Sequence, residues 1–165
     1  MTGRFHIKAS GQSVRIAALV SLCAAALHAT LVCATGTNAA DLQSPVGLWK
    51  TFDDKTGAAR ALVRIYTEDG RLFGRIERSL TPGDERRVCE QCTDERRNQP
   101  IAGLLIMRQM KATDDGFAGG DILDPDNGTV YRCKFHLDQN GSRLVVRGYI
   151  GFSLLGRSQL WQRQE

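Results

Sequence analysis

Histidine is scarce in this 165-residue chain, which has three, and only His136 lies beyond residue 40. A serine or cysteine catalytic triad would therefore have one candidate base there, and the residue pattern around His136 places it on the outer face of a strand. Ser153 and Ser158 lack the G-x-S-x-G context of a nucleophile elbow. The chain also lacks a paired-carboxylate pattern, a phosphate-binding loop and a dinucleotide-binding fingerprint. We therefore expect neither enzymatic activity nor a cofactor.

Beyond residue 40, the chain also lacks an excess of charge of either sign. Three of the 22 basic residues and none of the 18 acidic residues lie in the first 40 positions, so the remainder is close to neutral. A nucleic-acid-binding protein needs a clustered basic surface to neutralise phosphates. The sequence therefore predicts no nucleic-acid partner.

The first 40 residues have the features of a secretory signal peptide. Arg4, Lys8 and Arg15 precede an apolar run over 16–34, and small residues follow up to Ala40. This order predicts cleavage near Ala40, export to the bacterial periplasm or the outside, and no stable membrane anchor after cleavage. An uncleaved single-span anchor is the alternative, because about 17–25 apolar residues suffice to cross a bilayer.

The remaining residues, 41–165, are expected to form one all-β domain. Short runs of β-forming residues alternate with turn signals, among them Asp69-Gly70 and Asn127-Gly128, which favour tight hairpins. The run at 104–112 also fits a short helix, but a strand is preferred. The expected strands are 46–52, 60–67, 71–78, 104–112, 117–123, 129–137 and two more in a hairpin over 142–163.

Eight short strands joined mostly by turns predict a single antiparallel up-and-down barrel. Leu144, Val146, Gly148 and Ile150 alternate with polar or outward positions in the last hairpin, as in a half-buried strand. Because strands occur at both ends of the domain, we expect the sheet to close on itself. A barrel of this size is filled by side chains or holds one small ligand.

Several sequence blocks lie between residues 44 and 163: Gly47-Leu48-Trp49-Lys50-Thr51, Gly74-Arg75-Ile76, Cys89 with Cys92, Ile122-Leu123-Asp124-Pro125 with Asn127-Gly128, Arg147 to Gly151, and Leu155-Gly156-Arg157 to Trp161 and Arg163. In their order and spacing, these blocks resemble an exported bacterial family catalogued as domain of unknown function number 2147. The resemblance implies a lipocalin-like (calycin-like) barrel and no known activity.

The Gly47-x-Trp49 element also looks like the opening strand of lipocalins. In that family the tryptophan packs across the bottom of the barrel, under an arginine from near the last strand. The resemblance therefore implies a structural brace between Trp49 and either Arg163 or Arg157. A guanidinium over an indole ring is a cation–π contact worth about 0.5–2 kcal/mol.

Cys89 and Cys92 form a C-x-x-C motif inside a long charged loop at 79–100. No βαβ pattern surrounds them, which argues against thioredoxin-like chemistry. A structural zinc site needs four ligands, and beyond residue 40 few other cysteine or histidine side chains are present to supply them. In an oxidising compartment we expect a Cys89–Cys92 disulfide, a free buried Cys133 and no metal. A bond from one loop cysteine to Cys133 is the alternative.

Three hypotheses for function follow. In the first, the barrel binds a small apolar or lipid-like ligand. In the second, it is an envelope or secreted interaction module with a packed core, and the charged loop contacts a protein partner. In the third, the C-x-x-C carries out thiol redox chemistry. The residues expected to line a ligand site, which would equally fit a packed core, are Val63, Ile65, Tyr131, Phe135, Leu144, Val146 and Ile150.

Overall fold

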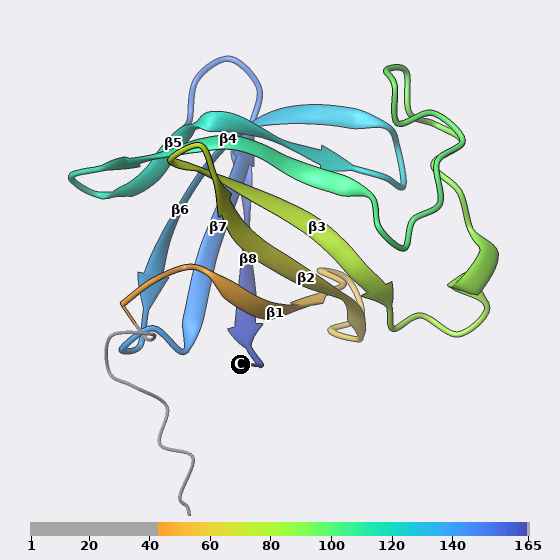
Figure 1. The fold of residues 1–165 in the computed structure, drawn as a ribbon, viewed down its shortest axis with the longest axis horizontal. Helices are drawn as coiled ribbons and strands as arrows, with labels where there is room; N and C mark the ends of the chain where they lie inside the picture. Colours follow the sequence, from red (N-terminus) through yellow and green to blue (C-terminus); the bar gives the residue numbers. More distant parts are fainter. Residues whose placement is uncertain (1–42, 165) are drawn as a thin grey trace, which may run out of the picture. The chain divides into compact units, whose positions relative to one another are not determined.

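In a computed structural model that describes residues 43–164, the chain forms a closed antiparallel barrel of eight strands (Figure 1). Each strand pairs with the next in sequence, and the last pairs with the first. The expected all-β, up-and-down barrel is therefore confirmed, whereas the expected signal peptide lies outside the described residues. The strands are β1 (Gly47–Phe52), β2 (Ala59–Glu68), β3 (Arg71–Ser79), β4 (Leu105–Thr113), β5 (Gly116–Asp124), β6 (Thr129–Asp138), β7 (Arg143–Tyr149) and β8 (Gly156–Arg163).

The strand boundaries follow the turn chemistry of the sequence. The two-residue turn between β2 and β3 is Asp69-Gly70, and both residues have positive φ angles, as a type I′ turn requires. The ambiguous run at 104–112 is a strand, because β4 pairs with both β3 and β5. Within the described residues, no helix is long and apolar enough to cross a membrane.

Side chains alternate between the barrel interior and the solvent. In β6, Cys133 and Phe135 are buried, whereas Arg132, Lys134 and His136 are exposed. This is the period-2 burial of a strand with one face in the core. The strand pairings close the barrel around this core.

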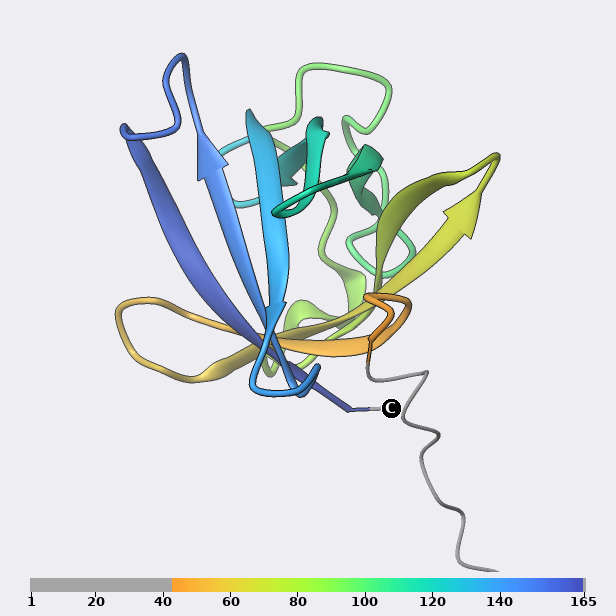
Figure 2. The same ribbon diagram turned by 90° about the vertical axis from the view of Figure 1, so that its left-hand side faces the viewer.

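The antiparallel order divides the connections between two ends of the barrel. The connections at 53–58, 80–104, 125–128 and 150–155 follow β1, β3, β5 and β7 and therefore gather at one end, here called the open end. The short turns after β2, β4 and β6 lie at the other end, here called the closed end, together with residues 43–46 and the end of β8. Figure 2 shows β6, β7 and β8 side by side as one wall.

The long connection between β3 and β4 packs on the barrel instead of forming a solvated excursion. It contains a short 3-10 helix, η1 (Asp84–Arg86), and an isolated bridge between Val88 and Pro100. Cys89, Cys92, Arg96, Ile101 and Leu104 are all buried. Apolar side chains, together with an arginine that pairs within the connection, fix this segment to the barrel.

Candidate ligand-binding cavity

A cavity of about 550 Å³ lies at the open end of the barrel. Its volume falls within the range of roughly 300–1,000 Å³ that is usual for small-molecule sites. Apolar and aromatic side chains from seven strands and from the β3–β4 connection form its wall: Val63, Ile76, Ile101, Ile106, Ile122, Leu123, Tyr131, Val146 and Trp161.

The interior nearer the closed end is packed with side chains, and a second, more open hollow of about 350 Å³ lies at its edge, lined by residues such as Leu72, Met110 and Phe117. Ile65, Phe135 and Leu144 are at most 2% exposed, yet they do not line the cavity. The Phe117 and Phe135 rings stack there with their centres 4.9 Å apart. The barrel is therefore packed in one half and hollow in the other, so its interior combines features of the first two sequence-based hypotheses.

The seven residues expected to line a ligand site thus divide into three groups. Val63, Tyr131 and Val146 line the cavity, and Ile65, Phe135 and Leu144 lie in the packed half. Ile150 is 62% exposed, contrary to the expectation that it lines a ligand site. The reason is that β7 ends at Tyr149, so the alternation that places Val146 inside does not extend to Ile150.

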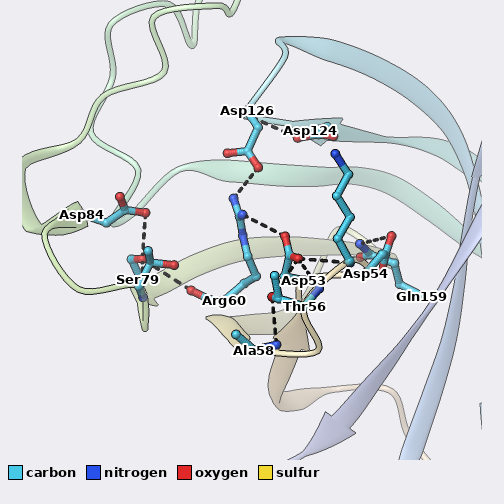
Figure 3. A network of polar contacts seen from close by, with 12 residues as sticks. Asp53, Asp54, Thr56, Ala58, Arg60, Ser79, Asp84, Asp124, Asp126 and Gln159 are labelled. Carbon is cyan, nitrogen blue, oxygen red and sulfur yellow. Dashed lines mark hydrogen bonds and ion pairs between the residues drawn. The ribbon is translucent and has the colours of Figure 1, made fainter.

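Charged side chains surround the mouth of the cavity. The Arg60 guanidinium lies 3.4 Å from the Asp53 carboxylate and also pairs with Asp126, which lies in the β5–β6 turn (Figure 3). Asp126 accepts a second ion pair from Arg87, and Arg87 lies 3.3 Å from Asp84. This chain of alternating charges links β2, the β3–β4 connection and the β5–β6 turn.

Local turn geometry positions the carboxylates of this network. Asp53 accepts hydrogen bonds from the backbone and hydroxyl of Thr56, at 2.8 and 2.9 Å, and from the Lys55 N–H. These bonds, mainly those from Thr56 and with a smaller contribution from Arg60, hold the pKa of Asp53 below its ordinary value. Asp53 therefore remains ionised at neutral pH.

Arg87 is the member of the network that comes from the long connection. Burial by itself would lower the pKa of Arg87, but hydrogen bonds and charge attraction from Asp126 and Asp84 outweigh it and raise the pKa. The guanidinium therefore stays charged at the mouth. The Cys89 sulfur lies 3.7 Å from the Pro125 carbonyl oxygen, so the connection lies against the same turn.

A second polar group lies on the β8 side of the mouth. Arg157 is 2.7 Å from Asp54, and Gln159 donates to the same carboxylate at 3.3 Å. Arg157 is thus not the arginine over Trp49. That position belongs to Arg163, whose guanidinium carbon lies 4.3 Å from the centre of the Trp49 ring.

Two of the described cysteines form a disulfide and one is free. Cys89 and Cys92 form a disulfide with Cα atoms 5.4 Å apart, and both residues are at most 1% exposed. Cys133 is the free cysteine among residues 43–164, and burial, with a smaller effect of Asp121, raises its pKa to about 12. None of the described residues form a group of three or more metal-ligating side chains.

The charged mouth is the part of the site that sequence reasoning missed. Asn127-Gly128 was expected as a hairpin turn and was assigned no role in a site. Counting strand directions in an up-and-down barrel would have placed this turn and the connection at 53–58 at the same end as the long charged connection. The pairing of Arg60 and Arg87 with one carboxylate, Asp126, has no signal in the sequence.

Comparisons with known proteins identify one similar structure and one matching family. The structure matches that of protein HP1028 from Helicobacter pylori, which belongs to the lipocalin family, with a TM-score of 0.65 and 14% sequence identity. The match covers 74% of this chain and 84% of that protein and shows a shared fold. No curated protein matches the sequence. The model of the DUF2147 family, described as uncharacterized proteins conserved in bacteria, matches residues 47–163, and the chain belongs to this family.

Proposed function

We propose that this protein binds one small amphipathic, lipid-like molecule in the cavity at the open end of the barrel. The observation that carries the proposal is the hollow half of the interior, about 550 Å³, with an apolar wall and a charged mouth. The apolar part of the ligand would contact side chains such as Ile106, Ile122 and Val146. Its polar group would lie at the mouth, near Arg60 and Arg87.

The apolar wall, the charged mouth and the packed half of the barrel each favour the binding of such a ligand. Transfer of apolar ligand surface from water into such a wall contributes about 25 cal/mol per Å². The mouth offers guanidinium donors and carboxylate acceptors to a polar group, so the ligand need not bury an unsatisfied polar atom. The packed half supplies a rigid base, which limits the ordering cost of binding.

The likeness to a lipocalin-family structure supports the same class of function through the fold. We further propose that binding takes place in the periplasm or outside the cell, as the leader suggests, and that the protein acts by binding and not by catalysis. The third hypothesis, thiol redox chemistry, gains no support from the geometry. Both disulfide sulfurs are buried, so an attacking thiolate has no direct access to them.

Two neighbouring valines of β7 give a matched test of the proposal. Val146 lines the cavity, whereas Val145 lies on the opposite face of the strand. The fluorescent probe 11-(dansylamino)undecanoic acid should bind to a chain that begins at Asp41 and quench the fluorescence of Trp161 by energy transfer. Val146→Trp should reduce the affinity at least about tenfold by filling the cavity, and Val145→Trp should leave it unchanged.

Native mass spectrometry of protein purified from its own cells provides a second test. A species heavier than the polypeptide by the mass of one small molecule should appear, and it should be lost in Val146→Trp. Repeated masses equal to that of the bare polypeptide, together with equal probe binding by the two tryptophan variants, would rule out the cavity as the site.

A further inference from the structure

The β7–β8 connection presents four apolar side chains to the solvent. Ile150, Phe152, Leu154 and Leu155 are 62%, 79%, 88% and 74% exposed. Single exposed apolar residues are common, but a group of four within six consecutive residues marks an interaction site. The segment 150–155 is here called the apolar tip.

Hydrogen bonds from one arginine hold the apolar tip in shape. Arg147 donates from Nε to the Ser153 carbonyl at 2.7 Å and from Nη2 to the Leu154 carbonyl at 3.0 Å. It also donates from Nη1 to the Ser158 hydroxyl at 2.9 Å, on β8. The apolar side chains are therefore displayed by an ordered loop at the outer end of the β7–β8 hairpin (Figure 2).

Cationic side chains lie beside the apolar tip. Of the four arginines in residues 139–164, Arg147 and Arg157 lie at the end of the hairpin that carries the tip, whereas Arg143 and Arg163 lie at the closed end. On the neighbouring strand β6, Arg132 and Lys134 are exposed, and Lys134 lies opposite Arg147 in the sheet register. Two acidic neighbours, Asp121 and Asp54, are already paired with Arg108 and Arg157.

We propose that the apolar tip docks the barrel onto a membrane surface that contains anionic lipids. Exposed apolar side chains bind at the boundary between head groups and acyl chains, and nearby cations are attracted to anionic head groups. A protein partner fits less well, because a stable protein interface buries about 800 Å² on each side and the apolar tip has six residues.

Docking in this way would bring the cavity mouth close to the bilayer. Gly148, which lines the cavity, pairs with Arg157 at the end of the hairpin next to the apolar tip. A lipid-like ligand would then pass between bilayer and cavity over a short path. This consequence rests on the proposed function, whereas the docking itself does not.

Vesicle co-sedimentation tests the proposal on a chain that begins at Asp41. The probes are phosphatidylcholine vesicles with and without phosphatidylglycerol. We expect binding to the anionic vesicles that weakens with salt, and a loss of at least about tenfold in the triple variant Phe152→Ser, Leu154→Ser, Leu155→Ser. Val46→Ser, at the closed end and 40% exposed, is the matched control and should bind like the parent chain.

The contribution of charge is tested separately. Lys134→Gln should weaken binding to anionic vesicles roughly fivefold and leave binding to phosphatidylcholine unchanged. Equal sedimentation of the parent chain and the triple variant would overturn the proposal. Dimerisation in the absence of vesicles that disappears in the triple variant would also overturn it, in favour of self-association.

The two proposals fail independently of each other. In solution, the triple variant should bind 11-(dansylamino)undecanoic acid as the parent chain does, because its substitutions lie outside the cavity. Val146→Trp should lose the probe and keep vesicle binding. Loss of vesicle binding in Val146→Trp with retained near-ultraviolet circular dichroism would contradict docking through the apolar tip.

Discussion

The guanidinium of Arg163 lies over the ring of Trp49, 4.3 Å from its centre, and joins the last strand of the barrel to the first. The same side chain donates hydrogen bonds to the carbonyls of Gly141, Val46 and Ser44, at 2.7, 3.1 and 2.6 Å. One arginine therefore connects the β6–β7 turn, the residues before β1 and the end of β8. The β1–β8 pairing has two Cα partners in register, and the Gln164 N–H donates to the Leu48 carbonyl at 2.8 Å, so the Arg163 side chain reinforces a short seam.

Replacing Arg163 should weaken the barrel at this seam. Arg163→Met removes the cation–π contact, worth about 0.5–2 kcal/mol, and several charge-assisted hydrogen bonds. We expect the free energy of unfolding to fall by about 2–4 kcal/mol in urea denaturation. Arg163→Lys should recover only part of this loss, because an ammonium cannot reproduce the planar fork of donors.

Arg157→Met is the matched control for that experiment. Arg157 is 65% exposed in its pair with Asp54, and exposed ion pairs contribute about 0–1 kcal/mol. The urea midpoint of Arg157→Met should therefore stay close to that of the parent chain. Equal destabilisation by the two substitutions would show that Arg163 does not close the barrel.

Gly128 marks the point where the long connection meets the β5–β6 turn. Its φ is +70°, and a Cβ atom added there would lie 1.8 Å from the Gln91 carbonyl oxygen. Gly57 has φ +71° but no atom within 4 Å of such a Cβ. Gly57→Ala should therefore cost about 1 kcal/mol of backbone strain, and Gly128→Ala at least about 2 kcal/mol more.

Limited proteolysis distinguishes these two glycine variants further. Arg86 and Arg97 lie in the long connection, which Gly128→Ala should push away from the barrel. We expect trypsin to cleave this connection faster in Gly128→Ala than in Gly57→Ala under native conditions. Identical cleavage rates and equal stabilities would show that the close approach of Gln91 to Gly128 is not required.

Asp94 neutralises Arg96, whose side chain is 5% exposed. Arg96 donates from Nε to Asp94 at 3.0 Å and from Nη1 to the Leu105 carbonyl at 3.2 Å. Asp94→Asn leaves this guanidinium buried without its counter-ion and should cost about 2–3 kcal/mol in thermal or urea unfolding. Glu95→Gln removes a 72% exposed carboxylate and should cost less than about 0.5 kcal/mol.

The same carboxylate predicts a dependence on pH. The Arg96 hydrogen bonds, against an opposing effect of burial, lower the pKa of Asp94 from 3.8 to about 2. A lowered pKa stabilises the folded state above pH 3.8, and the effect is lost as the pH falls through about 2. The parent chain should therefore lose about 1 kcal/mol more than Asp94→Asn over this window, after screening of the partly exposed pair. If the free energy of unfolding changed equally with pH in the two proteins, Asp94 would not be the group responsible for this pH dependence.

Cys133 should be unreactive in the folded protein. It is fully buried and its pKa is raised to about 12, so little thiolate exists and reagents cannot reach it. In a chain that begins at Asp41, iodoacetamide at about pH 8 should label Cys133 no faster than the protein unfolds. Mass spectrometry of the quenched reaction measures this rate. Rapid labelling under native conditions would show that the thiol is accessible.

Much of the fold could be predicted from residues close together in the sequence. The Asp69-Gly70 and Asn127-Gly128 turns and the alternation in β6 and β7 predict strands by local chemistry. The placement of Val146 in the cavity wall follows from the same alternation. Ile150 breaks it, because the position where a strand ends depends on its pairing partner as well as on its own residues.

The candidate site was less predictable because its parts are far apart in the sequence. Arg60 and Arg87 converge on Asp126 over separations of 66 and 39 residues. The long connection has a polar sequence, yet Arg96 is buried within it because Asp94 supplies its counter-charge. Such pairings depend on which strand ends meet, and composition carries no information about them.

The sequence by itself determined the elements of this protein: eight β-forming segments, the turns between them and an up-and-down order that favours closure. These follow from backbone preferences and short-range alternation, which act within a few residues. The tertiary structure alone decided that one half of the barrel is packed and the other hollow, and that an apolar tip stands beside the cavity mouth. Those features depend on how side chains from distant strands fill a shared volume, which local preferences do not specify.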